Sequence, residues 1–333
     1  MRVGIIGCGA IAARAHIPAF LKYGADIVAL ADIDLNRANR LAKRFNIPHV
    51  FSDHHELLAT NVELVSICTP PQKHASMAIA AANAGKNILL EKPMAGSVED
   101  AESIIHACKM NDVKLCMMHE YRFIPCIQEA KRRVTSGRLG QIIAIAITAH
   151  PQFPMRWSDS EWLYEKWSLL DDVGVHYLDI LAYLTDAVAK HVSVVARDTT
   201  GKLGFFDYIQ ATIELEGSCV AQLDLSWAAG SYELTSRVFG TAGRIDIDIR
   251  NDYLSELHGY VTPIDEIHAT MHKSWRTVSN VLRKRYFRGA LLYHELLIRD
   301  FLASISRGED PPVGPEEGRT TVELLEQIKR ATC

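Results

Sequence analysis

The chain has 333 residues, of which 48% are hydrophobic and 23% charged, and its formal net charge is −4. A chain of this length exceeds one ordinary core, so we expect two domains. The charge balance predicts no nucleic-acid partner, and no apolar run is long enough for stable membrane insertion. The glycine-broken N-terminus does not resemble a secretory signal, and the seven dispersed cysteines lack a CxxC pair. We therefore expect reduced thiols and a cytoplasmic location.

Residues 1–120 alternate short apolar runs with segments of helical periodicity, which is typical of a doubly wound parallel sheet. We predict an α/β domain over this range. Its predicted strands are Val3–Ile6, Ile27–Ala31, Leu64–Cys68, Ile88–Leu90 and Lys114–Met118. Its predicted helices are Ile11–Tyr23, Asn36–Phe45, His74–Ala84 and Val98–Met110.

The pattern becomes β-rich after Pro125, which predicts a second, α+β domain over residues 121–333. Strict period-two alternation near residue 247 indicates a strand with one solvated face. The predicted strands are Gln141–Ala149, Val192–Arg197, Tyr208–Leu215, Cys219–Trp227, Glu233–Gly240 and Arg244–Ile249. The predicted helices are Val175–Tyr183, Leu291–Ile305 and Pro315–Arg330.

A glycine turn follows the first predicted strand and opens a helix, with the sequence GCGAIA over residues 7–12. Glycines at these positions permit a tight turn and close approach of the backbone to a pyrophosphate, which a helix N-terminus stabilises. Asp32 ends the second predicted strand, where an acid can bind the ribose hydroxyls of an adenosine. Two plainer interpretations stay open: a tight turn without a nucleotide, and Asp32 as a helix-capping acid.

Thr69, Pro70 and His74 follow the buried strand at residues 64–68, and two prolines force the chain out of the sheet there. The carboxyl ends of strands are where doubly wound sheets bind ligands. We therefore expect these three residues to line the cofactor. For His74, a simple helix-start role is the alternative.

Two further strings carry reactive groups. Lys92 follows the apolar run at residues 87–90, so it stands at the carboxyl end of a predicted buried strand. Asp172 and His176 are four residues apart, hence on one face if their segment is helical. The plain alternatives are a solvated lysine at the strand end and a buried structural histidine. The fourteen histidines are dispersed, and we expect no metal site.

The chain resembles the glucose–fructose oxidoreductase / inositol dehydrogenase / MocA family over essentially its whole length. The most diagnostic motif of this family is the EKP string, here residues 91–93, together with the AGK that precedes it at residues 84–86. The matching segments, in order and spacing, are Gly7-x-Gly9-x-x-Ala12, Thr69-Pro70-Pro71-x-x-His74, Ala84 to Pro93 (AGKNILLEKP), and Asp172-x-Gly174-x-His176-x-x-Asp179.

The resemblance implies an N-terminal Rossmann domain, a C-terminal domain with an open, mostly antiparallel sheet, and NAD or NADP bound between them. It implies oxidation or reduction of a ring carbon in a sugar, cyclitol or nucleotide sugar, and a homodimer or homotetramer formed through the open sheet. The cofactor-binding residues it implies, together with those argued above, are Gly7, Gly9, Ala10, Ile11, Asp32, Arg37, Thr69, Pro70, His74, Glu91 and Lys92.

Lys92, Asp172 and His176 are the catalytic residues that the resemblance implies. His176 titrates near neutrality and can take a proton from a hydroxyl as hydride leaves the same carbon. Lys92 can stabilise negative charge on that oxygen, and Asp172 can orient the substrate or the imidazole. We expect NAD in preference to NADP because Asp32 would face the 2′-phosphate, although Arg37 can offset part of that repulsion.

The chain departs from the family at residues 166–168, where Lys-Trp-Ser replaces a common glycine triplet. Bulk there puts free-sugar specificity in doubt, and we take Trp167 as a candidate substrate contact. Arg122 and Arg156 are further candidates; for Arg122, holding the cleft is an equal alternative.

We expect an atypical basic helical segment over residues 262–290. Within it, residues 271–290 hold six basic residues and no acid, with an apolar stripe at helical spacing. Three interpretations stay open: a helix packed on its own domain or a partner subunit, an arm that receives phosphates, and a peripheral membrane contact.

Three functions fit the sequence. The first is a dehydrogenase, the second a sensor without catalysis that keeps the cofactor fold, and the third an enzyme whose tightly held NAD is oxidised and reduced without net turnover. Retention of the lysine, aspartate and histidine argues against the sensor.

Overall fold

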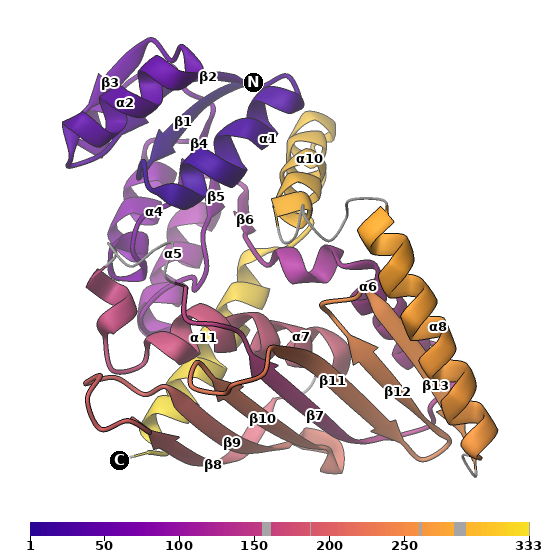
Figure 1. Cartoon of the computed structure of the whole chain (residues 1–333). Helices are drawn as coiled ribbons and strands as arrows, with labels where there is room; N and C mark the ends of the chain where they lie inside the picture. The colour runs from indigo at the N-terminus through magenta and orange to yellow at the C-terminus, as the bar shows by residue number, and fades with distance from the viewer. Residues whose placement is uncertain (155–160, 187, 260–261, 283–290, 333) are drawn as a thin grey trace. The chain divides into compact units, whose positions relative to one another are not determined.

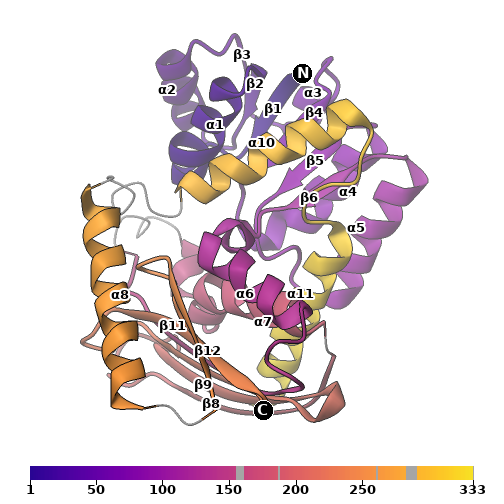
Figure 2. The ribbon, with the colours of Figure 1, turned by 90° about the vertical axis from the view of Figure 1, so that its right-hand side faces the viewer.

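The computed structural model describes residues 1–154, 161–186, 188–259, 262–282 and 291–332 (Figures 1 and 2). The chain divides into two compact units. The first contains residues 1–120 and 290–323, and the second contains residues 121–289 and 324–333. Residues 290–323, which the sequence assigned to the C-terminal region, therefore fold with the N-terminal sheet.

The first unit is built on a six-stranded parallel sheet in the order β3-β2-β1-β4-β5-β6. Strand β4 is buried at every position, as expected for a sheet covered on both faces. The doubly wound fold predicted from the apolar runs is confirmed. The strands are β1 (Arg2–Ile6), β2 (Asp26–Ala31), β3 (His49–Phe51), β4 (Leu64–Ile67), β5 (Asn87–Leu90) and β6 (Leu115–Met117).

Helices connect these strands, and one further helix returns from the far end of the sequence. Helix α10 (Leu291–Arg307) packs against α1 and the helical turn before it (Figures 1 and 2). Its buried face contributes Leu297, Ile298 and Phe301 to the core of this unit. The other helices are α1 (Ile17–Lys22), α2 (Leu35–Phe45), α3 (His54–Leu58), α4 (His74–Asn83), α5 (Val98–Met110) and the first half of α11 (Pro315–Arg330).

The second unit is built on a seven-stranded sheet in the order β13-β12-β11-β7-β10-β9-β8. All neighbours pair antiparallel except β7 and β10, which are parallel. The predicted open, mostly antiparallel sheet is thus confirmed. The strands are β7 (Ile142–His150), β8 (Ala189–Arg197), β9 (Tyr208–Leu215), β10 (Val220–Ser226), β11 (Glu233–Gly240), β12 (Gly243–Asp248) and β13 (Tyr253–His258).

Burial alternates along the strands of this sheet, so one face packs on a core and the other is more exposed. Helices α6 (Pro125–Thr135) and α7 (Val175–Thr185) contact each other, and they reach the sheet at β12 and β7 respectively. Helix α8 (Pro263–Leu282) lies along β13 at the sheet edge (Figure 1). Among the described residues no helix is long and apolar enough to cross a membrane.

Several elements were not predicted from the sequence: β3, α3, α6 and β13. Helix α8 begins at Pro263, next to residue 262 where the predicted basic helical segment starts, and Asp265 and Thr262 form hydrogen bonds at its N-terminus. The remainder of that segment, residues 283–290, lies outside the described residues.

Candidate cofactor and catalytic site

The glycine turn after β1 has the backbone that a pyrophosphate needs. Gly7 has a φ of +91°, and a Cβ there would stand 2.6 Å from the carbonyl oxygen of Cys68. A Cβ on Gly9 would meet nothing within 4 Å, so open space lies above the turn. Helical turns then run from Ala10 to the end of α1, and the first amide groups of a helix have no carbonyl partner within it. The turn therefore fits a dinucleotide.

Asp32 follows β2 and organises the same turn. Its carboxylate accepts the amide of Cys8 at 2.7 Å and the amide of Asp34 at 2.8 Å. Capping of α2 falls to Asp34, which accepts the amides of Asn36 and Arg37. Asp32 therefore does not cap α2. Its carboxylate lies at the end of β2, beside the glycine turn. The guanidinium of Arg37 lies 3.6 Å from it.

Ile33 is a residue that the sequence reasoning missed. Its side chain directly follows Asp32 and is 92% exposed. An exposed apolar side chain beside the acid that ends β2 is available for contact with a ligand. The sequence feature that points to Ile33 is its position immediately after Asp32.

The turn after β4 is fixed from within by His74. The ring of His74 is fully buried, with Nδ1 2.7 Å from the Pro93 carbonyl and Nε2 2.9 Å from the Thr69 carbonyl. Burial lowers the pKa of this imidazole, and its two carbonyl contacts oppose that effect. His74 thus ties the loop after β4 to the loop after β5, while Thr69 is partly exposed and Pro70 exposed on that loop.

Glu91 and Lys92 stand at the carboxyl end of β5. The amide of Glu91 bonds to the Ile67 carbonyl and extends the ladder by one residue. The Glu91 side chain is buried, whereas Lys92 is partly exposed. Successive side chains along an extended chain alternate in direction, in keeping with the burial of Glu91 and the partial exposure of Lys92. The first unit therefore carries the glycine turn, Asp32 and Lys92 at the carboxyl ends of β1, β2 and β5.

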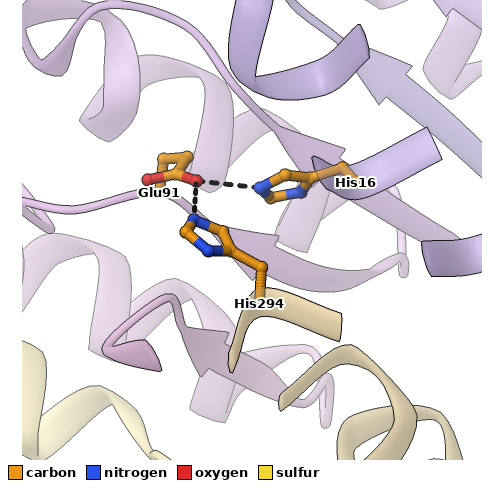
Figure 3. Close-up of side chains that lie close together, drawn as sticks. All are labelled: His16, Glu91 and His294. Carbon is orange, nitrogen blue, oxygen red and sulfur yellow. Dashed lines mark hydrogen bonds and ion pairs between the residues drawn. The ribbon is translucent and has the colours of Figure 1, made fainter. Parts of the chain in front are cut away.

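Two groups of described residues gather metal-ligating side chains. The exposed group is Asp53, His54 and His55, and the buried group is His16, Glu91 and His294 (Figure 3). The buried residues are 75 and 203 positions apart in the sequence, so motif spacing could not reveal them. The Nε2 atom of His16 lies at hydrogen-bond distance, 2.8 Å, from Oε1 of Glu91, which occupies the atoms that a metal would need.

Asp172 and His176 belong to one continuous helical run of the second unit. A π-helical turn (Leu170–Gly174) contains Asp172 and leads directly into α7, whose second residue is His176. The imidazole stacks on the ring of Tyr121, with centroids 4.4 Å apart and planes 15° from parallel. Both side chains are partly exposed. The stacking fixes the plane of the imidazole, and Tyr121 is a supporting residue that the sequence did not single out.

Arg122 is engaged within the second unit. Its guanidinium makes a bidentate ion pair with Asp179, with Nη2 to Oδ1 at 2.7 Å and Nε to Oδ2 at 3.0 Å, and it covers the ring of Tyr183. Asp179 is fully buried. This geometry joins Arg122 to α7, and substrate contact by Arg122 remains a prediction.

The Lys-Trp-Ser segment at residues 166–168 packs against the loop before β9. The Trp167 ring meets the Phe206 ring edge-on at 4.9 Å, and the Lys166 carbonyl accepts the Phe206 amide. Ser168 is buried, while Trp167 stays partly exposed. Substrate contact by Trp167 remains a prediction, and Arg156 lies outside the described residues.

Comparison with known proteins decides the family. Residues 1–119 match the family described as "Oxidoreductase family, NAD-binding Rossmann fold", and residues 127–246 match the GFO/IDH/MocA C-terminal domain. The chain belongs to this family. The resemblance inferred from the motifs is confirmed: the protein is an oxidoreductase, and NAD is its cofactor.

Relatives of known activity cover nearly the whole chain. Myo-inositol 2-dehydrogenase of Thermotoga maritima is 24% identical, over 99% of this chain and 96% of its own. Among solved structures, the WlbA dehydrogenase of Bordetella pertussis with NADH and UDP-GlcNAcA has a TM-score of 0.84 at 21% identity, covering 99% and 95% of the two chains. UDP-N-acetylglucosamine 3-dehydrogenase of Acidithiobacillus ferrooxidans has a TM-score of 0.78 at 23% identity, covering 99% and 97%. These structures share the fold of this family member.

Proposed function

We propose that this oxidoreductase transfers a hydride between NAD and a ring carbinol or ketone of a sugar, cyclitol or nucleotide sugar. The observation that supports this most directly is the end of β5. There a buried Glu91 precedes a partly exposed Lys92, in the same sheet that carries the glycine turn and Asp32. A nucleotide-binding sheet does not need a lysine at that position for its structure. A lysine there suits a reaction at the nicotinamide end of the cofactor.

The glycine turn would hold the pyrophosphate and Asp32 the adenosine ribose, and bound NAD supplies the hydride acceptor. His176 would accept the hydroxyl proton when the C–H bond breaks, since an imidazole titrates near neutral pH. Lys92 would donate a hydrogen bond to the same oxygen and stabilise the charge that develops on it. Asp172, one turn before His176, would orient the substrate or the imidazole. In the reductive direction His176 returns the proton.

The substrate class rests on the named relatives and on residues 166–168. One relative is named for an inositol and another for a nucleotide sugar. In this chain Trp167 presents a partly exposed aromatic ring where glycines are common in the family. An aromatic face suits the apolar face of a pyranose ring.

A panel assay tests the proposal. NADH absorbance is followed with myo-inositol, free hexoses and UDP-N-acetylglucosamine, using protein freed of endogenous cofactor. We expect NAD-dependent turnover of at least one panel member. Tight NAD that co-purifies without NADH release would instead support transient oxidation without net turnover, and NAD binding without any chemistry would contradict the proposal in favour of a sensor.

Assembly and location belong to the same proposal. The exposed face of the second-unit sheet is where a homodimer or homotetramer would form. The six described cysteines are buried and free, in keeping with a reducing cytoplasm.

A further inference from the structure

The first unit contains a cluster of buried ionisable side chains directly behind Lys92. His16 comes from the helical run after the glycine turn, Glu91 from the end of β5 and His294 from α10; all three point toward one another (Figure 3). Each is at most 7% exposed. Burying charged groups costs free energy unless they are paired, so a cluster of this kind requires a reason.

A chain of hydrogen bonds runs through this cluster to the backbone of Lys92. Ser66, on β4, lies 2.8 Å from Nδ1 of His16, and Nε2 of His16 lies 2.8 Å from Oε1 of Glu91. The other carboxylate oxygen of Glu91 accepts the Lys92 amide at 3.2 Å. The His16 imidazole therefore connects the helical run that follows the glycine turn, through Glu91, to the backbone of Lys92.

The charge states strengthen these bonds. Burial alone favours a neutral imidazole, but the Cys68 sulfur and the Glu91 carboxylate outweigh it and raise the pKa of His16 to about 10. Burial likewise opposes ionisation of Glu91, yet the hydrogen bond and charge of His16 lower its pKa to about 2. His16 is then a cation that donates from both nitrogens, to Ser66 and to Glu91. Hydrogen bonds between ionised partners are the stronger kind.

His294 completes the cluster from α10. Its Nε2 atom lies 3.9 Å from a carboxylate oxygen of Glu91 and 3.9 Å from one of Glu120. Its ring meets the His16 ring edge-on, with centroids 6.0 Å apart. Burial raises the pKa of Glu120, and the nearby charge of Glu91 adds to that effect. His294 thus stands between two buried carboxyl groups and places α10 beside the end of β5.

We propose that His16, Glu91 and His294 are positioning residues that fix Lys92 relative to the cofactor turn. This inference rests on the proposed role of Lys92. The Glu91 side chain is contacted from the helical run that carries His16 and from α10, and a fixed Glu91 sets the direction in which the next side chain leaves the strand. Displacement of a reacting group by about 1 Å can cost roughly 10²-fold in rate, so such support affects turnover rather than cofactor affinity.

A double-mutant cycle tests the inference. Glu91→Gln keeps the side-chain volume but removes the charge, and it should lower kcat about 10- to 100-fold with NADH affinity changed less than about threefold. In a Lys92→Met background the same substitution should lower kcat by less than about twofold, because its effect passes through Lys92. His294→Gln should act in the same direction. Glu102→Gln and His106→Gln, both exposed on α5, are the matched controls.

A second readout needs no substrate. Acetic anhydride labels lysines at a rate that depends on the environment of the amine, and peptide mass spectrometry gives that rate for each lysine. Glu91→Gln should change the rate at Lys92 and leave the rate at exposed Lys73 unchanged. Thermal unfolding identifies variants that fail to fold. If Glu91→Gln is one of them, His294→Gln replaces it in the double-mutant cycle.

The outcomes separate the inference from the proposed function. Full turnover by Lys92→Met would contradict the proposed role of Lys92. An inactive Lys92→Met together with additive losses in the cycle, or an unchanged labelling rate at Lys92, would overturn the positioning role alone. So would stoichiometric metal in the purified protein that is lost on His294→Gln, since the cluster would then be a metal site.

Discussion

Cofactor choice is decided at the scale of single residues. Asp32 holds the glycine turn through the Cys8 amide, and in the proposed binding mode its carboxylate faces the adenosine ribose. A 2′-phosphate beside this carboxylate would place like charges together, which costs several kcal/mol when they are poorly solvated. The exposed Arg37, 3.6 Å away, can neutralise only part of that charge.

We therefore expect NAD to bind more tightly than NADP. Asp32→Asn should narrow the difference in dissociation constant between the two cofactors, measured by fluorescence titration with NADH and NADPH. Asp34→Asn, which alters the cap of α2, should leave the ratio unchanged. Equal or tighter binding of NADPH to the unsubstituted protein would contradict the role of Asp32.

The buried His16–Glu91 pair should make stability depend on pH. The pKa of His16 is raised in the folded protein, so its stabilisation is fully present below its unfolded value of about 6.5 and is lost as the pH rises toward 10. For one proton the slope in that window is at most about 1.4 kcal/mol per pH unit. Urea unfolding at pH 6, 8 and 10 measures it, and His16→Gln should flatten the dependence. Equal slopes in the two proteins would mean that His16 is not a buried cation.

At the scale of elements, α8 has a polar side that makes ion pairs and hydrogen bonds and an apolar side that is exposed to solvent. Lys273 pairs with Asp248 at 2.8 Å and Arg276 with Asp252 at 2.7 Å, and the Tyr253 hydroxyl donates to the Ala269 carbonyl. These contacts support the interpretation of a helix packed on its own domain. The predicted apolar stripe is nevertheless exposed along its described length: Met271, Trp275, Val278 and Leu282.

Exposure predicts that the stripe contributes little to folding. Trp275 is 73% exposed, so Trp275→Ser should change the free energy of unfolding by less than about 0.5 kcal/mol. Phe301→Ala on α10, where the ring is fully buried, should cost about 3–5 kcal/mol. Urea denaturation of both variants provides the comparison. A large loss from Trp275→Ser would show that the stripe is covered in solution.

At the scale of the whole molecule, local patterns predicted the elements that they encode directly. Short apolar runs and the glycine turn located five of the six parallel strands, because a buried parallel strand has a nearly continuous apolar sequence. Helix α6 was missed although Pro125 stands at its first turn and its apolar positions are helically spaced. The β-rich sequence that follows concealed it.

Contacts between distant parts of the chain could not be predicted in the same way. His16, Glu91 and His294 have no common motif, and the return of α10 to the first unit brings His294 to the other two. The ion pair between Arg122 and Asp179 likewise joins residues 57 positions apart. Sequence motifs therefore identified the candidate reactive residues, whereas the residues that contact them are brought close only by tertiary packing.

The most direct test of the account is turnover by Lys92→Met and His176→Ala, measured with NAD and the best substrate of the panel. We expect each substitution to lower kcat by roughly 10²–10⁴-fold, as for loss of a general base or of charge stabilisation. For His176→Ala the dissociation constant for NADH should stay nearly unchanged, since His176 is not among the expected cofactor-binding residues. Wild-type turnover by either variant would contradict the assignment of Lys92 and His176 as the pair that moves the proton.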